Sequence, residues 1–253
     1  MSEPEFFRVL LVGWLVLAAV TFVALFFVQA PYGRYTRKGW GPAIDRRFGW
    51  ILMESPSAVL FALFYVLGEN RAGLVPLVFL FMWEVHYLHR SFVFPFRMRG
   101  ERKKMTLAPV LLAVVFNVGN AYLNGRWLYT LSPPYPDAWL SDPRFVIGAF
   151  LFALGYGVNK HADAVLRNLR RPGETGYKIP HGGLYRFVSC PNYLGEVIEW
   201  CGWAIATWSL AGLAFAVWTF ANLVPRAWAH HRWYRERFPD YPPRRKAVIP
   251  FLL

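Results

Sequence analysis

Polar side chains recur at helical spacing in a chain that is otherwise strongly apolar. Asn159, Asp163 and Arg167 follow one another at intervals of four residues, so they would lie on one face of a helix. Asn192 and Glu196 would share a face of a later helix in the same way. Ionisable groups are costly where helices lie in a membrane, which makes them functional candidates by default. The spacing therefore predicts a polar binding site between two helices.

The segment between these two stretches has the composition of an anion-binding loop. Residues 167–191 include several arginines that could contact phosphates, and glycines that let a ligand approach the backbone closely. Tyr177 and Tyr185 add aromatic rings as stacking surfaces. Such a set suits a large anionic cofactor. The lone G-x-G at 155–157 lacks the strand and the third glycine of a dinucleotide fingerprint, and its expected role is close helix packing.

Further polar residues gather in three other apolar stretches. They are Glu54 in the first, His86, Tyr87, His89 and Arg90 in the second, and Arg226, His230, His231 and Tyr234 in the third. Neither histidine pair has the spacing of a known zinc signature with its glutamate base, so no metal site is predicted. For any single residue, an ion pair that only ties two helices together is the alternative, for example between Asp163 and Arg167. The alignment of all these polar residues along helix faces favours a binding site.

The apolar stretches predict an all-α, polytopic membrane protein. The chain of 253 residues is 56% hydrophobic and 19% aromatic, which is more than a soluble domain usually carries. Residues 9–28 and 201–225 hold no charge, and about 20 helical residues cross a hydrocarbon core of roughly 30 Å. The predicted spans are residues 6–30, 50–68, 73–94, 107–123, 145–166, 192–209 and 212–231. They would form a single domain over residues 1–253.

The last hydrophobic block is too long for one span. As a continuous helix, residues 192–231 would reach roughly 60 Å, about twice the thickness of the hydrocarbon core. The chain is therefore expected to reverse near residues 209–212. This reversal gives the seventh span.

The distribution of positive charge predicts the orientation of the chain. Lys and Arg accumulate in short loops on the cytoplasmic side of a membrane. Here they gather in residues 31–49, 95–106 and 167–191 and in the C-terminal tail, which places the N-terminus outside and the C-terminus in the cytoplasm. The net charge of +13 is then explained by orientation and by attraction to anionic lipid, without nucleic acid. A more specific interpretation of this positive charge is that it binds a phosphate-rich ligand on the cytoplasmic side.

The first apolar run has an alternative interpretation as a cleaved signal peptide. Residues 28–30 resemble a small-residue cleavage site. The preceding residues Glu3 and Glu5 are acidic, whereas a signal peptide begins with positive charge, and the apolar stretch is too long. A retained membrane span is the favoured interpretation.

Four segments of the chain resemble the steroid 5-alpha-reductase family. They are LMESPS (52–57), VHYLHRSFV (85–93), GYGVNKHADAVLRNLRRPGETGYKIPHGGLYRFVSCPNYLGEVIEW (155–200) and the terminal RAWAHHRWYRERFPDYPPRRKAVIPFLL (226–253). The similarity is strong over the later part of the chain and weak over residues 1–50. It implies a seven-helix membrane bundle, NADPH bound at the cytoplasmic side, and a 3-oxo-4-ene steroid that enters from the lipid.

The resemblance also implies roles for individual residues. Tyr87 matches the position that hydrogen-bonds the substrate ketone, and Glu54 matches its acidic partner, so these two are the expected catalytic and substrate-binding residues. The positions that match the NADPH site are Asn159, Asp163, Arg167, Arg170, Tyr177, Lys178, Asn192, Glu196, Arg226, His230 and Tyr234.

Two residues depart from the family pattern. Lys178 stands where relatives often carry Arg, which keeps the charge but loses bidentate geometry and so weakens the expected preference for a 2′-phosphate. Glu84, one helical turn before Tyr87, has no match. It could reshape the substrate pocket or pair with a neighbour.

These observations predict an NADPH-dependent membrane reductase that converts 3-oxo-4-ene steroids to 5-alpha-dihydro products. It would act as a monomer in the cytoplasmic membrane of a bacterium or the endoplasmic reticulum of a eukaryote. The nearest alternative is the same reduction of another lipid, such as a polyprenal or an enoyl thioester. A second is an isoprenylcysteine methyltransferase-like enzyme, although its positively charged S-adenosylmethionine suits a basic loop poorly. A third alternative is a channel or carrier. Such a protein would place its polar residues at the midplane of the membrane or through its full thickness, whereas here they cluster toward one side.

Overall fold

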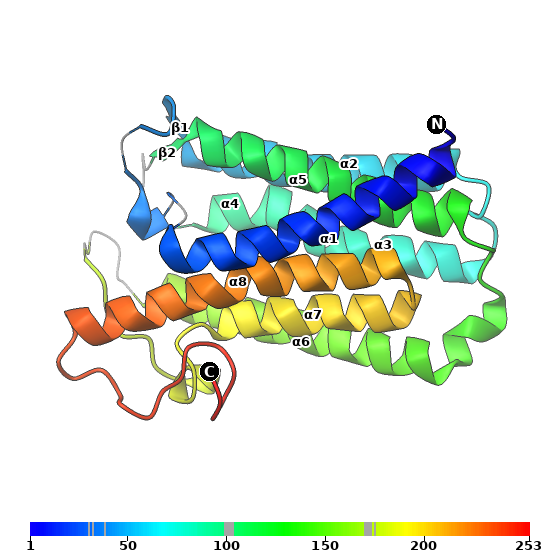
Figure 1. Cartoon of the computed structure of the whole chain (residues 1–253). Coiled ribbons are helices and arrows are strands. Elements are labelled where there is room, and N and C mark those ends of the chain that lie inside the picture. Colours follow the sequence, from blue (N-terminus) through cyan, green and yellow to red (C-terminus); the bar gives the residue numbers. More distant parts are fainter. Residues whose placement is uncertain (30, 32, 38, 99–103, 170–173, 175) are drawn as a thin grey trace. The chain divides into compact units, whose positions relative to one another are not determined.

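The computed structural model describes residues 1–29, 31, 33–37, 39–98, 104–169, 174 and 176–253. Within them the chain is helical apart from one two-stranded sheet (Figure 1). Its internal contacts form two compact units, one of Met1–Leu11 with Ala30–Pro143 and the other of Val12–Gln29 with Arg144–Leu253. The single domain over residues 1–253 remains a prediction.

Seven long helices in the described residues correspond to the seven predicted spans. They are α1 (Glu3–Phe27), α2 (Arg46–Leu67), α3 (Leu74–Leu88), α5 (Leu107–Arg126), α6 (Pro143–Asn168), α7 (Pro191–Thr207) and α8 (Leu210–Arg237). Four helical segments are long and apolar enough to cross a membrane: α1, α2, α8, and α5 extended to Leu131. The structure therefore supports a helical membrane protein. The count of seven spans and their orientation remain predictions.

A short two-stranded sheet directly precedes two helices of the first unit, so that both begin beside it. β1 (Ala43–Asp45) pairs antiparallel with β2 (Lys104–Thr106), and α2 and α5 follow these strands directly. Asp45 caps α2, because its Oδ1 accepts hydrogen bonds from the backbone N–H groups of Arg47 at 2.8 Å and Phe48 at 3.1 Å. Although the two strands are antiparallel, α2 and α5 run in the same direction from the sheet (Figure 1).

Side-chain contacts fix α2 against both of its neighbours in the first unit. The Asn117 amide on α5 donates to the backbone carbonyl of Met53 on α2 at 2.6 Å. On the α3 side, the Trp83 ring stacks on Phe61 with centroids 4.3 Å apart. One face of α2 therefore packs against α5, and another packs against α3.

The end of α3 departs from regular α-helix. It widens into a π-helical turn at His89–Val93 and continues as the short α4 (Phe94–Arg97). Pro95 accounts for the irregularity, because proline lacks the N–H that would bond the carbonyl four residues earlier. Single π-helical turns inside helices are frequent at functional sites.

Glycines bring α6 and α7 of the second unit into unusually close contact. A Cβ on Gly155 would lie 2.5 Å from the carbonyl oxygen of Gly195, and one on Gly202 would lie 2.6 Å from that of Gly148. Both distances are far below van der Waals contact, so only glycine allows this approach. The packing role expected for Gly155 is confirmed. For Gly157, two residues later, the same expectation is wrong, because nothing lies within 4 Å of its Cβ position.

The chain reverses between α7 and α8, as predicted. Trp208 adopts a left-handed conformation with φ 44°, and the Ser209 Oγ then caps α8 by accepting from the Gly212 N–H at 2.9 Å. α8 packs on the part of α1 that belongs to this unit, where the Trp218 indole N–H donates to the Trp14 carbonyl at 2.8 Å.

The tail after α8 folds back onto the segment that precedes α7. The Ser189 N–H donates to the Lys246 carbonyl at 2.8 Å. The Ser189 Oγ lies 2.7 Å from His231 Nδ1 and 2.6 Å from the Tyr241 hydroxyl. This buried network ties the C-terminal tail to α8 and to the start of α7.

Candidate active site

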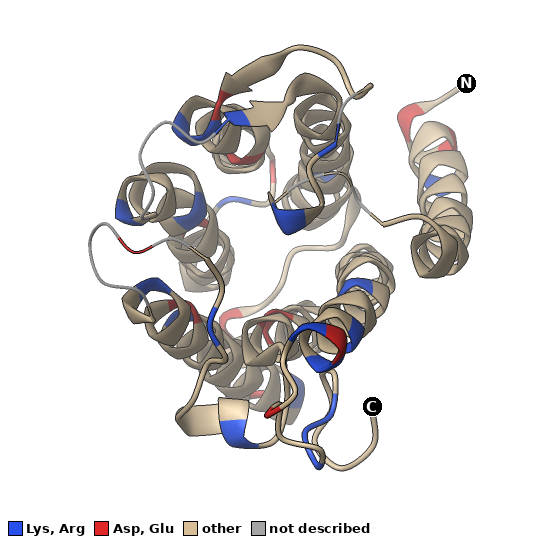
Figure 2. Ribbon diagram, turned by 90° about the vertical axis from the view of Figure 1, so that its left-hand side faces the viewer, with Lys and Arg blue, Asp and Glu red and all other residues tan. Residues whose placement is uncertain are grey.

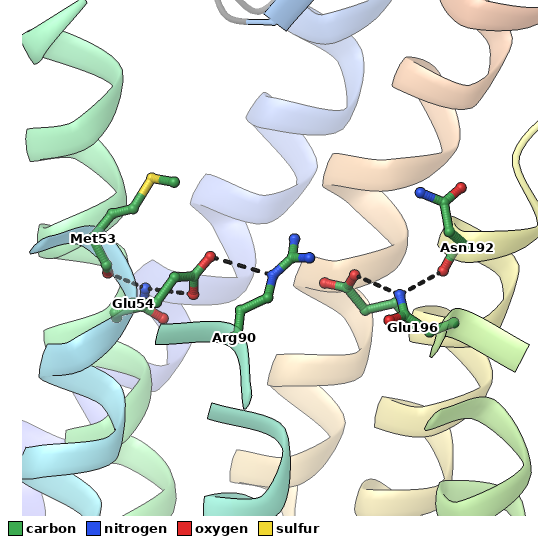
Figure 3. Close-up of polar contacts among 7 residues, drawn as sticks. Met53, Glu54, Arg90, Asn192 and Glu196 are labelled. Carbon is green, nitrogen blue, oxygen red and sulfur yellow. Dashed lines mark hydrogen bonds and ion pairs between the residues drawn. The ribbon is translucent and has the colours of Figure 1, made fainter. Parts of the chain in front are cut away.

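Glu54 is the centre of a polar cluster in the first unit. Its Oε1 lies 3.6 Å from Nε of Arg90, and its Oε2 lies 3.4 Å from Nδ2 of Asn117 (Figure 3). Both charged side chains are mostly buried, with 15% of Glu54 and 17% of Arg90 exposed. Charge interactions are stronger in such surroundings than in water. The cluster therefore fixes the direction of the Glu54 carboxylate.

Aromatic rings hold Arg90 in place. Its guanidinium carbon lies 4.6 Å from the ring centroid of Trp50 and 4.9 Å from that of Phe94. Arginine stacks favourably on aromatic faces, where it keeps its charge and gains packing. The π-helical turn that carries Arg90 thus presents it against two rings and toward Glu54.

Tyr87 lies on the same stretch of the interface between α2 and α3. Before it on α3, the Trp83 indole N–H donates to the Ser57 carbonyl on α2 at 3.3 Å, and after it Arg90 reaches Glu54. Tyr87 is 3% exposed, and its ring centroid lies 5.0 Å from that of Trp83. The two residues expected to act on the substrate ketone therefore belong to one helix interface.

Glu84 lies one turn before Tyr87 and is partly buried. Its Oε1 is shielded from solvent and accepts no hydrogen bond from the described residues. An ion pair with a neighbour, one of the two expectations for Glu84, is not found in the described part of the chain.

Asn159 joins α6 to α7 in the second unit. Its Nδ2 donates to the Asn192 carbonyl at 3.0 Å and lies 3.4 Å from Glu196 Oε2, and Figure 3 shows Asn192 and Glu196 on α7. The Asn192 Nδ2 donates in turn to Asp163 Oδ1 at 3.3 Å. Four of the five residues singled out by their spacing thus form one network. The glycine contacts between the two helices make these short links possible.

The side-chain carbonyl oxygen of Asn159, Oδ1, is buried and has no hydrogen-bond donor among the described residues. A buried acceptor without a donor is costly, and native proteins rarely leave one unsatisfied. The amide therefore fits a ligand that brings an N–H group.

Arg226 and His230 on α8 meet at Tyr193 on α7. The Arg226 Nη2 donates to the Tyr193 hydroxyl at 3.0 Å, and the same hydroxyl lies 3.3 Å from His230 Nε2. Tyr193 was not predicted from the sequence as a site residue. Its place beside Asn192, within the polar start of α7, was the available signal.

The predicted aromatic positions differ in their exposure. Tyr177 is 47% exposed, and its ring centroid lies 5.0 Å from that of Trp233, so one face can serve a ligand. Tyr234 is buried. Tyr185 is 1% exposed and donates to the Ala162 carbonyl at 3.4 Å. Burial raises the pKa of the Tyr185 phenol, which keeps it protonated as a donor. The expectation that Tyr185 is a stacking surface is therefore wrong.

Basic residues of the second unit gather at one end of its helices. Arg167 lies in the last turn of α6 and Arg235 in the last turn of α8, and Figure 2 looks onto these helix ends. Lys178 forms an exposed ion pair with Glu174 at 2.6 Å, and Arg170 lies outside the described residues. This end of the unit therefore attracts anionic ligands.

Comparison with known proteins gives the family of the chain. Residues 103–253 match the family described as 3-oxo-5-alpha-steroid 4-dehydrogenase. The chain belongs to this family. The resemblance inferred from its four sequence segments is confirmed. As a member, the chain is an oxidoreductase that acts on CH–CH groups, and its apolar helices agree with a membrane enzyme.

Individual relatives match over nearly their full length. The chain is 49% identical over 242 residues to 3-oxo-5-alpha-steroid 4-dehydrogenase 1 of Bos taurus, which covers 94% of this chain and 93% of the relative. It is 41% identical over 255 residues to steroid 5-alpha-reductase DET2 of Gossypium hirsutum, covering 99% of both chains. For 3-oxo-5-alpha-steroid 4-dehydrogenase 1 of Homo sapiens, the identity is 44% over 224 residues, 87% of this chain and 85% of the relative.

Two residues of the first-unit cluster, Asn117 and Arg90, were not predicted as catalytic or binding residues. Asn117 was not predicted from the sequence. Arg90 was predicted to share a helix face with Tyr87, three residues before it, but not to pair with Glu54. The signal for Asn117 is a single amide within the apolar run 107–123, since buried polar groups need hydrogen-bond partners.

Proposed function

We propose that the chain reduces the 4-ene double bond of 3-oxo-4-ene steroids to give 5-alpha-dihydrosteroids, with NADPH as the reductant. The relatives from Bos taurus and Gossypium hirsutum are named for steroid chemistry of this kind. One observation carries the proposal for this chain. Glu54 and Arg90 meet, among apolar and aromatic side chains, at the interface of α2 and α3 that also holds Tyr87, and Asn117 reaches Glu54 from α5. A lipid-soluble ketone would find its polar contacts there.

The Tyr87 hydroxyl is the proposed donor to the substrate ketone. Addition of hydride to the alkene carbon distal to the carbonyl moves negative charge onto the ketone oxygen, as an enolate. NADPH, when bound, supplies this hydride. A hydrogen-bond donor positioned at a developing oxyanion commonly contributes about 3–4 kcal/mol to transition-state stabilisation. Protonation of the carbon next to the carbonyl, from water or a nearby acid, completes the reduction.

Glu54 is proposed to orient the Tyr87 phenol. The carboxylate itself is oriented by Arg90 and Asn117, so it can accept a hydrogen bond from Tyr87 in a defined direction. An isolated negative charge at this place would oppose the enolate that forms nearby. The Arg90 guanidinium offsets that charge, so Glu54 can act without repelling the developing negative charge.

The second unit supplies residues that fit a pyridine dinucleotide. The Asn159 Oδ1 is a buried acceptor without a donor, and the carboxamide of a nicotinamide carries N–H groups of the required kind. Arg226 and Arg167 would hold phosphates, and the exposed ring of Tyr177 offers a face to the base. Lys178 would hold a 2′-phosphate as a single point charge, so discrimination against NADH should be weaker than with arginine.

The remaining proposed cofactor contacts complete this assignment. They come from Asp163, Arg170, Asn192, Glu196, His230 and Tyr234. We place all seven long helices in the membrane of a monomer, with the N-terminus outside and the C-terminus in the cytoplasm. The membrane would be the cytoplasmic membrane in a bacterium or the endoplasmic reticulum in a eukaryote. The substrate would enter from the lipid, and NADPH from the cytoplasm.

Purified chain in detergent should oxidise NADPH only when a 3-oxo-4-ene steroid is added. Loss of nicotinamide absorbance reports the rate, and chromatography identifies the 5-alpha-dihydro product. Parallel reactions with NADH should be slower because the 2′-phosphate contact is lost. A polyprenal and an enoyl thioester test the nearest alternative. Activity confined to these non-steroid substrates would overturn the steroid assignment.

A further inference from the structure

The outer face of α6 is not used by the proposed active site. Gly155 and Asn159 face α7. Leu154, Gly157 and His161 lie on the opposite side of the helix, at intervals of three and four residues. Leu154 is 45% exposed. This face is therefore open to the surroundings of the second unit.

A cavity of about 570 Å³ follows this face of α6. One wall is α6 from Ala153 to Ala162, and the other is the 3-10 turn η5 (Gly183–Arg186) with Phe187 and the start of α7. A second cavity of about 490 Å³ shares His161 with the first and includes His181. Most of the lining is aliphatic. The basic and imidazole side chains are Arg186, His161 and His181.

Gly157 keeps the first cavity open. Glycine is a poor helix former, and at Gly155 its presence is explained by the close approach of α7. No such reason exists at Gly157, since a Cβ there would meet nothing within 4 Å. Any larger side chain at this position would project into the cavity, which Gly157 lines. The absence of a side chain thus preserves space for a ligand.

The polar residues of the cavity favour a negative group. Arg186 is exposed and forms no ion pair within the described residues. The His161 ring is packed against Gly183, where a Cβ would lie 3.0 Å from Nδ1. The imidazole is therefore held at the cavity wall. An available cation beside an aliphatic groove fits a molecule with a negative head and a hydrocarbon chain.

We propose that this cavity binds an anionic phospholipid. The acyl chain lies along Leu154, Gly157 and Val158, and the phosphate lies at Arg186 and His161. Four helices other than α6 are long and apolar enough to cross a membrane, which would bring the chain into contact with lipid, and basic residues at the membrane surface attract anionic lipid. A neutral steroid would leave Arg186 without a counter-charge. The site is separate from the residues assigned to the reduction, so either assignment can fail alone.

Lipid binding to the intact chain tests the proposal without any turnover. Native mass spectrometry of the detergent-purified protein, titrated with phosphatidylglycerol or phosphatidylcholine, should show preferential binding of phosphatidylglycerol. Arg186→Gln should weaken phosphatidylglycerol binding about fivefold, the effect of one cation near anionic lipid, and leave phosphatidylcholine binding unchanged. Equal binding of the two lipids by the unmodified chain would overturn the proposal, as would an unchanged preference in Arg186→Gln.

Substitutions at Gly157 test the groove itself. Gly157→Leu should weaken binding of both lipids because the side chain fills the cavity, whereas Gly157→Ala should bind nearly as the unmodified chain does. Gly13→Leu is the matched control on α1, where a Cβ also meets nothing within 4 Å. Equal loss of binding in Gly13→Leu and Gly157→Leu would contradict a specific site. Displacement of the lipid by millimolar inorganic phosphate would show a phosphate site without an acyl-chain groove and would also overturn the proposal.

Discussion

Replacing Tyr87 with phenylalanine should lower the turnover of a 3-oxo-4-ene steroid about 100- to 1,000-fold, the usual effect of removing one oxyanion donor. The ring would remain packed against Trp83 and His86, so the helix interface should persist. Because only the hydroxyl is lost, the KM for NADPH should change little. Steady-state kinetics with each substrate varied in turn separate these effects.

A tyrosine elsewhere in the first unit provides the control for this experiment. Tyr65 packs edge-on against Tyr129, with ring centroids 5.3 Å apart, and is not assigned to the site. Tyr65→Phe should therefore retain nearly full turnover. If Tyr87→Phe were as active as Tyr65→Phe, the hydroxyl of Tyr87 could not be the donor to the ketone.

The same glycine-to-alanine change should have opposite effects at two neighbouring positions of α6. Gly155→Ala should destabilise the protein by about 1–3 kcal/mol, because the new methyl group would overlap the Gly195 carbonyl oxygen at 2.5 Å. Gly157→Ala should stabilise it by up to about 1 kcal/mol, since alanine is the better helix former and the space is open. Thermal unfolding in one detergent compares the two variants directly.

Gly155→Ala should also weaken cofactor binding. Moving α6 away from α7 would lengthen the hydrogen bonds that join Asn159 to Asn192 and Glu196. The KM for NADPH should therefore rise more than the KM for the steroid. Equal unfolding temperatures for Gly155→Ala and Gly157→Ala would contradict the assigned packing, and an unchanged KM for NADPH would separate that packing from the cofactor site.

Long apolar runs allowed the helices of this chain to be predicted from its sequence. Their lengths identified the seven long helices, although several of the predicted spans include charged residues. The excessive length of residues 192–231 predicted the reversal that Trp208 and Ser209 produce. The sheet of β1 and β2 was not predicted, because strands of three residues are too short to show a periodicity. The π-helical turn before Pro95 was also missed, since proline can end or kink a helix in several ways.

Spacing along one helix revealed part of the candidate site, but contacts between helices did not follow from it. Asn159 and Asp163 share a face by their interval of four residues, and the structure joins them to Asn192 and Glu196. Asn117 reaches Glu54 across the interface of α2 and α5, two helices that follow paired strands far apart in the sequence. Tyr185 is buried because the segment around Gly183 folds against His161 on α6, which no local pattern indicates.

Isotope transfer tests the proposed reaction most directly. A 3-oxo-4-ene steroid would be reduced with NADPH deuterated at the transferable position, in ordinary water, and the deuterium would be located in the product by nuclear magnetic resonance. The proposed mechanism predicts deuterium at carbon 5, distal to the ketone, and a solvent proton at carbon 4. Deuterium at carbon 4, or at carbon 3 with the alkene intact, would contradict it.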